Sequence, residues 1–448
     1  MNTIDTITAI CTGMGGAIGI IRVSGKEALD IGNQIWRGSQ KLSEKNVRKM
    51  LLGNLKDEGG EPVLAVFMKG PHSYTGEDCV EIHCHGGNIS AKTVIQLSLK
   101  AGARLAEPGE FTFRAFVNGK LDLTQAEAVS DIISAETNTA FHLAERQISG
   151  LLTTQICEIR NVLTDVLSEC ESRLDFGEEE LDWQTPEALM NKSENAMLAI
   201  GDLLGTSQEG DVLRNGIRVV IAGRPNVGKS SLLNLLLGRD RAIVTNIAGT
   251  TRDTLEETAN IRNIPVQLID TAGIREVDDL IEGIGIERSK ESVEQAQVVL
   301  WLLDASIENF DEEYEEMIKH TKSKSNIIAV WNKVDLCKKD IPECKFPTAK
   351  ISALNNDGID KLLDLFEKAV WGYPHTEEPE VAINSRHQEL LETSLNAIPE
   401  AITNIEMESW ELSAVQIRSA IDSLGLIIGE TYDLDILDNI FSRFCIGK

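Results

Sequence analysis

The sequence predicts a multidomain protein in which an α/β domain with a parallel sheet is inserted into an all-α domain, behind an α+β N-terminal domain. Two observations predict this. A chain of 448 residues is too long for one hydrophobic core. Its apolar residues change from strand-like to helical spacing, then to alternating strands and helices, and back to helical spacing. The predicted domains are therefore 1–118, 119–215, 216–374 and 375–448.

The N-terminal domain mixes short apolar runs with glycine-rich turns. Residues 17–23 and 62–68 have the composition of strands, and turns are indicated at Gly86-Gly87 and Pro108-Gly109. This mixture indicates an α+β domain.

The regions 119–215 and 375–448 have helical periodicity, because their apolar residues recur every three or four positions. The spacing is clear at Leu152, Ile156, Ile159, Leu163 and Val166, and again at Leu391, Leu395, Ile398, Ile402, Ile417, Ile421, Leu424 and Ile428. The simplest interpretation is that both regions form one helical domain.

The inserted region 216–374 alternates apolar, β-branched runs with helical stretches. The runs are 217–222, 266–269, 298–303 and 327–331. Such alternation is typical of a parallel sheet covered by helices.

Composition limits the classes of function. The formal net charge of −28 argues against broad electrostatic capture of nucleic acid, so a partner is expected to hold most of any RNA substrate. No apolar run approaches the ~20 residues that span a bilayer, and no export signal is present, so we expect a soluble, cytoplasmic protein. The scattered Cys residues indicate reduced thiols. The alternation of His83, Cys84 and His85 in a strand disfavours a zinc site.

A phosphate-binding loop is predicted at Gly223-Arg-Pro-Asn-Val-Gly-Lys-Ser230, between the strand 217–222 and a helix expected to begin at Ser231. Its glycines let backbone N–H groups face the phosphates. Lys229 would neutralise the β- and γ-phosphate oxygens, and the Ser230 hydroxyl would bind Mg²⁺.

Two further segments fit the switch regions of a GTPase. Asp270-Thr-Ala-Gly273 follows a strand, where its carboxylate would hold Mg²⁺ through water and its glycine would sense the γ-phosphate. Gly249-Thr-Thr-Arg-Asp253 supplies hydroxyls, of which we favour Thr251 as the Mg²⁺ ligand.

The base is predicted to be guanine. Asn332-Lys-Val-Asp335 follows the strand 327–331, and the Asp335 carboxylate can accept hydrogen bonds from N1–H and the 2-amino group of guanine, which adenine lacks. Ser352-Ala-Leu354 would add a backbone N–H for guanine O6. The domain is therefore predicted to be a Ras-like α/β P-loop GTPase.

The predicted GTP contacts come from four parts of this domain. They are Asn226, Val227, Gly228, Lys229, Ser230 and Ser231; Thr245, Asn246, Ile247, Ala248, Gly249, Thr250 and Thr251; Asp270, Thr271, Ala272 and Gly273; and Asn332, Lys333, Asp335, Ser352 and Ala353.

With these motifs, the whole chain resembles the bacterial tRNA-modification GTPase family known as MnmE or TrmE. The specific features are the GTPase inserted within a helical domain, Gly109-Glu-Phe-Thr-Phe-Arg-Ala-Phe116 with Asn118-Gly-Lys-Leu-Asp122, and the C-terminal Phe444-Cys-Ile-Gly-Lys448.

The resemblance implies a homodimer that works with the flavoprotein MnmG as a heterotetramer. Together they would install an aminomethyl or carboxymethylaminomethyl group at C5 of the wobble uridine (U34) of certain tRNAs. A 5-formyl- or 5,10-methylene-tetrahydrofolate would supply the one-carbon unit, and glycine or ammonium would supply the amine. The partner would bring FAD and NADH. GTP hydrolysis would drive conformational steps.

The resemblance also implies site residues outside the P-loop. Arg22, Glu81, Lys120 and Lys448 match folate-binding positions, in an N-terminal domain similar to the folate-binding fold of the glycine-cleavage T-protein. Cys445 matches a mobile thiol near the folate, which would carry or activate the one-carbon unit.

Catalysis would differ from that of signalling GTPases, since Ile274 stands where those keep a water-orienting Gln. The family's substitute is a Glu matched by Glu282. K⁺ would replace an arginine finger, with ligands matched by Asn226, Thr245, Ile247 and Thr250.

Two alternatives stay open at this point. One is a ribosome-assembly GTPase of the Era or Der type, which a net charge of −28 and the lack of a basic RNA module disfavour. The other is a plain switch GTPase, which would hydrolyse GTP slowly and depend on exchange factors.

Overall fold

The computed structural model describes residues 5–57, 59–176, 182–239, 256–270, 295–307, 309–321, 326–337, 339–372, 379–432, 434–442 and 444–447. The chain divides into two compact units. One comprises Met1–Ile133, Ala144–Asp202 and Arg386–Lys448, and the other Ser134–Leu143 and Leu203–Ser385. The domain limits predicted from periodicity stay predictions, because these units follow spatial contacts.

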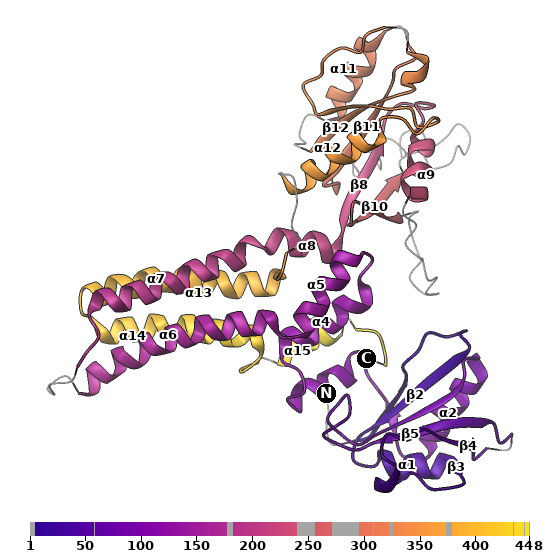
Figure 1. Ribbon diagram of the computed structural model, residues 1–448, viewed down its shortest axis with the longest axis vertical. Coiled ribbons are helices and arrows are strands. Elements are labelled where there is room, and N and C mark those ends of the chain that lie inside the picture. Colours follow the sequence, from indigo (N-terminus) through magenta and orange to yellow (C-terminus); the bar gives the residue numbers. More distant parts are fainter. Residues whose placement is uncertain are drawn as a thin grey trace. The chain divides into compact units, whose positions relative to one another are not determined.

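The first unit contains a seven-stranded sheet (Figure 1). Its strand order is β3 (Trp36–Gly38), β4 (Leu51–Leu55), β5 (Pro62–Met68), β6 (Cys79–His85), β2 (Ile18–Ser24), β1 (Ile7–Ile10) and β7 (Arg104–Leu105). The strands pair antiparallel, except that β1 and β7 are parallel. Helices α1 (Ala28–Ile35) and α2 (Asn88–Lys100) pack on one face, over a core that includes Ile21, Val80 and Ile82. The predicted α+β character is confirmed.

The face of this sheet opposite the helices carries the charged residues. Successive side chains of a strand point to opposite faces, so the neighbours of the buried Ile21 and Ile82 point away from the helices. In the register, Arg22 pairs with Glu81, and Glu81 pairs with Val66. These three residues therefore form one row across β2, β6 and β5.

Helix α3 (Glu110–Val117) contains most of the segment 109–116, which carries part of the family resemblance. Its Arg114 is fully buried and forms ion pairs with Asp5 at 2.7 Å, Glu110 at 2.9 Å and Glu77 at 3.2 Å. A buried charge is tolerated only when it is paired. The network thus fixes α3 against the start of the chain.

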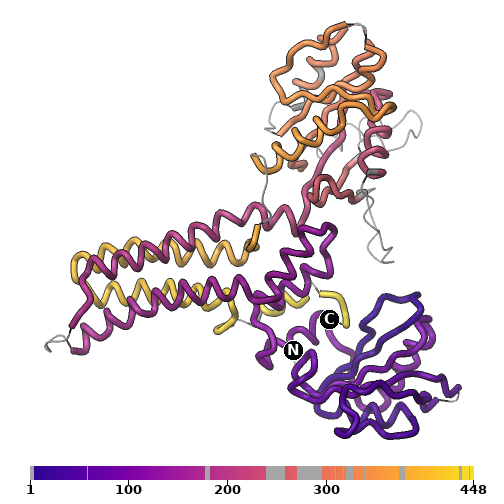
Figure 2. The backbone as a smooth tube through the Cα atoms, in the orientation of Figure 1, coloured from indigo at the N-terminus to yellow at the C-terminus, as the bar shows by residue number. Residues whose placement is uncertain are grey.

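The remainder of the first unit is helical. Its elements are α4 (Leu123–Ser134), α5 (Asn138–Ile148), α6 (Leu151–Asp175), α7 (Pro186–Gly205), α13 (Ser385–Glu406), α14 (Trp410–Ile428) and α15 (Leu434–Phe441), of which α4, α5, α7 and α13 cross the limits of the unit. Helices α6 and α14 lie side by side (Figure 2), so helices from both predicted helical regions pack together. The five predicted apolar positions of α6 are all buried.

A buried ionic cluster connects three helices of the first unit. Glu127 of α4 contacts Arg386 and His387, both at the start of α13, with 2.7 Å to each. Arg386 also donates to the carbonyl oxygens of Leu426 and Ile427 at 3.0 Å. The cluster therefore ties α4, α13 and α14 together within the first unit.

The second unit contains a six-stranded sheet in the order β13 (Thr348–Lys350), β12 (Ile327–Asn332), β11 (Val298–Asp304), β8 (Ile217–Ala222), β10 (Ile264–Asp270) and β9 (Glu256–Ile261). All pairs are parallel except β9 with β10. Among the described residues, the helices that lie wholly in this unit are α8 (Ser207–Asn215), α9 (Lys229–Arg239), α11 (Phe310–Thr321) and α12 (Ile359–Trp371). Val219 and Val220 belong to core clusters on opposite faces, which explains the continuous apolar runs.

Two of the predictions concern the start of a helix and the alternation of side chains in a strand. Helix α9 begins at Lys229, two residues before the predicted Ser231, because the Leu232 N–H donates to the Gly228 carbonyl at 3.0 Å and closes the first turn. In β6 the Cys84 side chain is buried and that of His85 exposed, as the alternation predicted, and the described residues hold no cluster that could bind a metal ion. Within the same residues, no helix is long and apolar enough to cross a membrane.

Candidate GTPase and folate sites

The P-loop joins β8 to α9, and at two of its positions the backbone conformation favours glycine. Gly223 has φ +139° and Gly228 has φ +101°. A Cβ on Gly223 would lie 2.4 Å from the Leu302 carbonyl oxygen, and one on Gly228 would lie 2.2 Å from Asn332 Nδ2. Asn226 also has a positive φ, +66°. The loop is therefore a backbone cradle in contact with β11 and β12.

Lys229, the cation of the predicted phosphate-binding loop, is the first residue of α9. Lys229 Nζ donates to the carbonyl oxygens of Gly223 and Arg224, both at 2.8 Å, so its ammonium group lies against the start of the loop. Ser230 and Ser231 are exposed in the first turn of α9. A helix N-terminus with exposed hydroxyls suits phosphate and Mg²⁺.

Asn332 joins three of the predicted segments. Its side-chain amide donates to the Val227 carbonyl at 2.8 Å, and its Oδ1 accepts from the Ala353 N–H at 3.0 Å. One buried side chain thus holds the P-loop, the end of β12 and the loop after β13 in register. Asp335 is exposed beside it, available to a ligand.

Lys333 is held by a residue that the sequence reasoning missed. Its Nζ lies 2.6 Å from Asp304 Oδ2, and Asp304 Oδ1 accepts from the Ser306 N–H and hydroxyl. Burial raises the pKa of Asp304, but the hydrogen bonds from Lys333 and Ser306 outweigh burial and keep the pKa below its ordinary value. The available signal was that Asp304 ends β11 as Asn332 ends the neighbouring β12.

Several predicted residues lie outside the described part of the chain. They are residues 245–251, 271–273, Glu282 and Lys448. Asp270 ends β10, and its side chain is not described.

In the first unit, Arg22 and Glu81 form a half-buried pair. Arg22 Nε and Nη2 each lie 2.9 Å from Glu81 Oε1, and the guanidinium lies over the rings of Tyr74 and Phe111 at 5.1 and 5.5 Å. Burial lowers the pKa of Arg22, but the neighbouring Cys11 and Glu81 outweigh it and raise the pKa. A charged pair with aromatic neighbours fits a flat, polar heterocycle such as a pterin.

The C-terminal segment lies against the same domain. Phe441 of α15 packs on Phe113 of α3 at 5.4 Å between ring centroids, and Phe444 is buried. Gly447, with φ +101°, is so close to β1 that a Cβ would lie 2.1 Å from the Ile10 carbonyl oxygen. Phe113 and Phe116 of segment 109–116 and Phe444 of the C-terminal tail belong to one hydrophobic cluster, together with Phe441.

The tail places an exposed thiol between two anchored residues. Cys445 is exposed, whereas Phe444 before it and Gly447 after it are buried. Cys11, which follows Ile10 and influences Arg22, is a second thiol in this neighbourhood that the sequence did not single out.

Together these features define a class: a multidomain protein with a P-loop GTPase domain. The MnmE helical domain model matches residues 123–445, and the model described as GTP-binding protein TrmE N-terminus matches residues 6–120. The chain belongs to the MnmE family of tRNA modification GTPases.

Curated relatives match along their whole length. The tRNA modification GTPase MnmE of Clostridioides difficile is 43% identical over 458 residues, covering 99% of each chain. That of Natranaerobius thermophilus is 44% identical over 459 residues, covering 100% of each. That of Aquifex aeolicus is 43% identical, covering 99% of this chain and 100% of the relative.

Similar solved structures cover only part of the chain. Aquifex aeolicus Era bound to GDP and AlF4⁻ is 30% identical, covers 40% of this chain and 66% of its own, and has a TM-score of 0.27. The G domain of the T. maritima FeoB iron transporter is 22% identical, covers 34% and 98%, and has a TM-score of 0.27.

Proposed function

We propose that this chain is a K⁺-stimulated cytoplasmic GTPase that, with the flavoprotein MnmG, installs aminomethyl or carboxymethylaminomethyl groups at C5 of the wobble uridine of certain tRNAs. The observation that carries the proposal is that two distant family segments, 109–116 and the tail that carries Cys445, share one hydrophobic cluster, and that the Phe111 ring of the first segment lies 5.5 Å from the Arg22 guanidinium. A thiol held in the same unit as Arg22 and Glu81 would suit one-carbon chemistry.

For GTP hydrolysis, the described residues supply the cradle and the base contacts. Backbone N–H groups between Gly223 and Gly228 would donate hydrogen bonds to the phosphates. Lys229 would give up its hydrogen bonds to the loop carbonyls and donate to phosphate oxygens instead. Asp335 would accept hydrogen bonds from guanine. Bound Mg²⁺, on Ser230 and Thr251, and K⁺, on Asn226, Thr245, Ile247 and Thr250, would neutralise developing phosphate charge. Glu282 is proposed to orient the attacking water.

For the tRNA reaction, Arg22 and Glu81 would orient the pterin end of a tetrahydrofolate, whose one-carbon group is the chemistry that it supplies when bound. Lys120 and Lys448 would face its carboxylates, and Cys445 would bring a thiol to the same place. The flavoprotein partner would contribute FAD and NADH and hold most of the tRNA, in keeping with the net charge of −28 on this chain.

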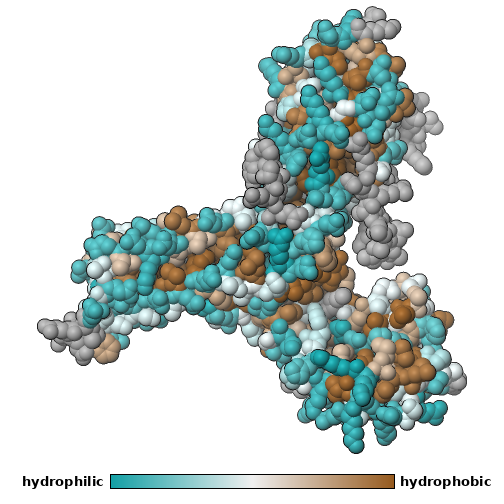
Figure 3. All heavy atoms as spheres, in the orientation of Figure 1, coloured by the Kyte–Doolittle hydropathy of each residue, from teal (hydrophilic) through white to brown (hydrophobic). Residues whose placement is uncertain are grey.

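A homodimer is proposed on symmetry and surface grounds. The N-terminal domain exposes large apolar side chains, including Ile18 at 59% and Leu52 at 68%, and Figure 3 shows hydrophobic atoms gathered on it. A two-fold partner would cover such a patch. A heterotetramer with two flavoprotein subunits is proposed to form on this dimer.

Nucleoside mass spectrometry of tRNA tests the proposal. Cells that lack this chain should lose the C5-modified wobble uridine, and the wild-type gene should restore it. A Lys229→Ala variant, which keeps the N-terminal domain and tail intact, should fail to restore it. Unchanged modification in the deletion strain would reject the proposed function.

A further inference from the structure

We propose that a cationic cavity beside the Arg22–Glu81 pair binds the γ-glutamyl tail of a polyglutamylated folate, and that Arg48 selects for this tail. The inference rests on the proposed use of folate and adds to it a substrate class and a residue that recognises it. Each γ-linked glutamate adds one carboxylate, so longer tails carry more negative charge.

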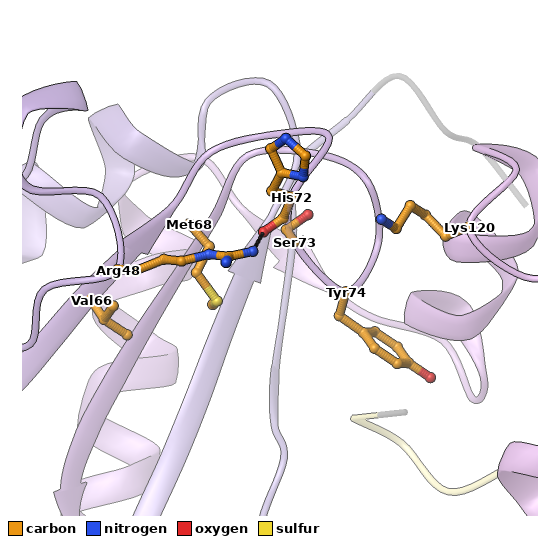
Figure 4. A pocket seen from close by; sticks show the side chains of 7 residues that line it. All are labelled: Arg48, Val66, Met68, His72, Ser73, Tyr74 and Lys120. Atoms are coloured by element: carbon orange, nitrogen blue, oxygen red, sulfur yellow. Dashed lines mark hydrogen bonds between the residues drawn. The ribbon is translucent and has the colours of Figure 1, made fainter. Parts of the chain in front are cut away.

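The cavity has a volume of about 340 Å³ and is lined by cationic as well as apolar side chains (Figure 4). It is lined by Arg48, Val66, Met68, His72, Ser73, Tyr74 and Lys120. Figure 4 shows Arg48 and Lys120 on either side of the segment that carries His72, Ser73 and Tyr74. None of these lining residues is an Asp or a Glu, so two cations face a space free of a competing carboxylate.

Arg48 is held in place by backbone contacts. It adopts φ +59°, its N–H donates to the Phe67 carbonyl at 2.7 Å, and its Nη2 donates to the His72 carbonyl at 2.7 Å. In the described part of the chain, its guanidinium has no ion-pair partner. The guanidinium is therefore fixed at the cavity with donors left for an anion.

Lys120 is a second cation at the cavity, and its stem is also held by neighbouring residues. Its stem packs on Gly76, where a Cβ would lie 3.3 Å from Lys120 Cγ, and Gly76 has φ +79°. Among the residues that the structure describes, none forms an ion pair with its ammonium. In a chain with net charge −28, two unpaired cations at one cavity indicate an anionic ligand.

The cavity adjoins the proposed pterin site. Val66 lines the cavity and is the neighbour of Glu81 in the sheet, on the same face. Tyr74 also lines the cavity, and its ring lies 5.1 Å from the Arg22 guanidinium. A folate is an elongated molecule with a pterin at one end and glutamate at the other, so a pterin at Arg22–Glu81 would direct its tail past Tyr74 into the cavity.

The shape and charge favour a glutamate tail over RNA. A cavity of about 340 Å³ with Val66 and Met68 in its wall suits a thin chain that has both methylene and carboxylate groups. An RNA backbone needs an extended basic surface, which a chain of net charge −28 disfavours.

Equilibrium binding to the full chain tests the inference, with 5-formyl-tetrahydrofolate as the monoglutamate and as the triglutamate. The wild type should bind the triglutamate roughly tenfold more tightly or better, and the preference should shrink between about 0.05 M and about 0.5 M salt. Arg48→Gln should reduce the preference to about twofold or less, because the triglutamate should lose more affinity than the monoglutamate does. Arg48→Lys, which keeps the positive charge, should retain most of the preference for the triglutamate. The matched control is Lys49→Gln, which removes an exposed cation that does not line the cavity.

The outcomes separate the two proposals. Equal affinity of the wild type for both folates, or an undiminished preference in Arg48→Gln, would overturn the role of the cavity and leave the use of folate standing. Failure to bind either folate would overturn both proposals. Loss of tRNA binding in Arg48→Gln, with the triglutamate preference intact, would assign the cavity to RNA and reject the inference.

Discussion

At the level of single residues, base choice is proposed to depend on Asp335, an exposed residue of the segment that begins with the buried Asn332. Asp335→Asn should weaken GTP binding by on the order of 10²-fold and shift preference toward xanthosine nucleotides, because an amide can donate to the xanthine 2-oxo group. Titration of the variant with GDP and with XDP measures both effects. Unchanged affinity for GDP would contradict the assignment of the base site.

A second single-residue prediction concerns K⁺. GTP hydrolysis should be fast in K⁺ and slow in Na⁺, because a smaller ion does not fit a cage of the same oxygens. Asn226→Ala should abolish the difference, which steady-state phosphate release in each salt would show. A variant that still distinguishes the two ions would remove Asn226 from the proposed K⁺ ligands.

A substitution of Cys445 should affect wobble-uridine modification but not GTP hydrolysis. Cys445→Ser should hydrolyse GTP at the wild-type rate and bind folate, while wobble-uridine modification should fall by roughly tenfold or more, because a hydroxyl forms almost no anion at neutral pH. The tail should still seat, since Phe444 and Gly447 are unchanged. Full modification by the Ser variant would mean that the tail has a structural role only.

At the level of elements, the sequence predicted those whose burial leaves a periodic pattern. The strands Ile217–Ala222 and Pro62–Met68 were predicted to the residue, because β8 is buried on both faces and β5 is bounded by turn residues. Cross-strand neighbours such as Val66, Glu81 and Arg22 could not be predicted from the residues, because their register depends on partners 15 and 59 positions apart.

The same distinction applies to the site. The P-loop and the Asn332 segment are contiguous motifs, so spacing alone located them. Asp304, Arg48 and Cys11 belong to no motif, and each acquires its place only when separate strands or loops meet. The fold class and the GTPase motifs were thus readable from the sequence, while supporting residues were not.

The cluster of Glu127, Arg386 and His387 predicts a pH-dependent stability of the helical elements. Burial raises the pKa of Glu127, but the charges of His387 and Arg386 outweigh burial and hold the pKa far below its usual value. A carboxyl group with a depressed pKa contributes stability above its unfolded pKa of about 4.3, and the contribution is lost as the pH falls below that value.

Glu127→Ala should therefore lower the free energy of unfolding of the first unit by about 3–5 kcal/mol at pH 7, because it leaves buried cations unpaired. The deficit should shrink below about pH 4. Urea denaturation followed by helical circular dichroism measures it. Glu430→Ala is the matched control, since Glu430 pairs with Arg160 at a more exposed site, and about 0–1 kcal/mol is expected. Equal losses in the two variants would reject the special role of the cluster.

At the level of the whole molecule, the exposed apolar residues of the N-terminal domain predict self-association. Light scattering should give at least twice the mass of one chain, and Leu52→Glu should shift it toward the monomer, because a charge would be buried in the interface. Leu412→Glu, at a residue of similar exposure in α14, should leave the dimer intact. A wild-type monomer, with and without a transition-state mimic, would contradict the proposed dimer.

We propose above all that guanine-nucleotide hydrolysis in the second unit serves tRNA modification by residues of the first unit. The most direct measurement is C5-modified wobble uridine formed in a reconstituted reaction with the flavoprotein partner, folate, tRNA and either GTP or XTP. Wild-type protein should form product with GTP, whereas Asp335→Asn should form almost none with GTP and regain product formation with XTP. Product formation by Asp335→Asn that is undiminished with GTP, or that needs no nucleotide, would contradict the claim.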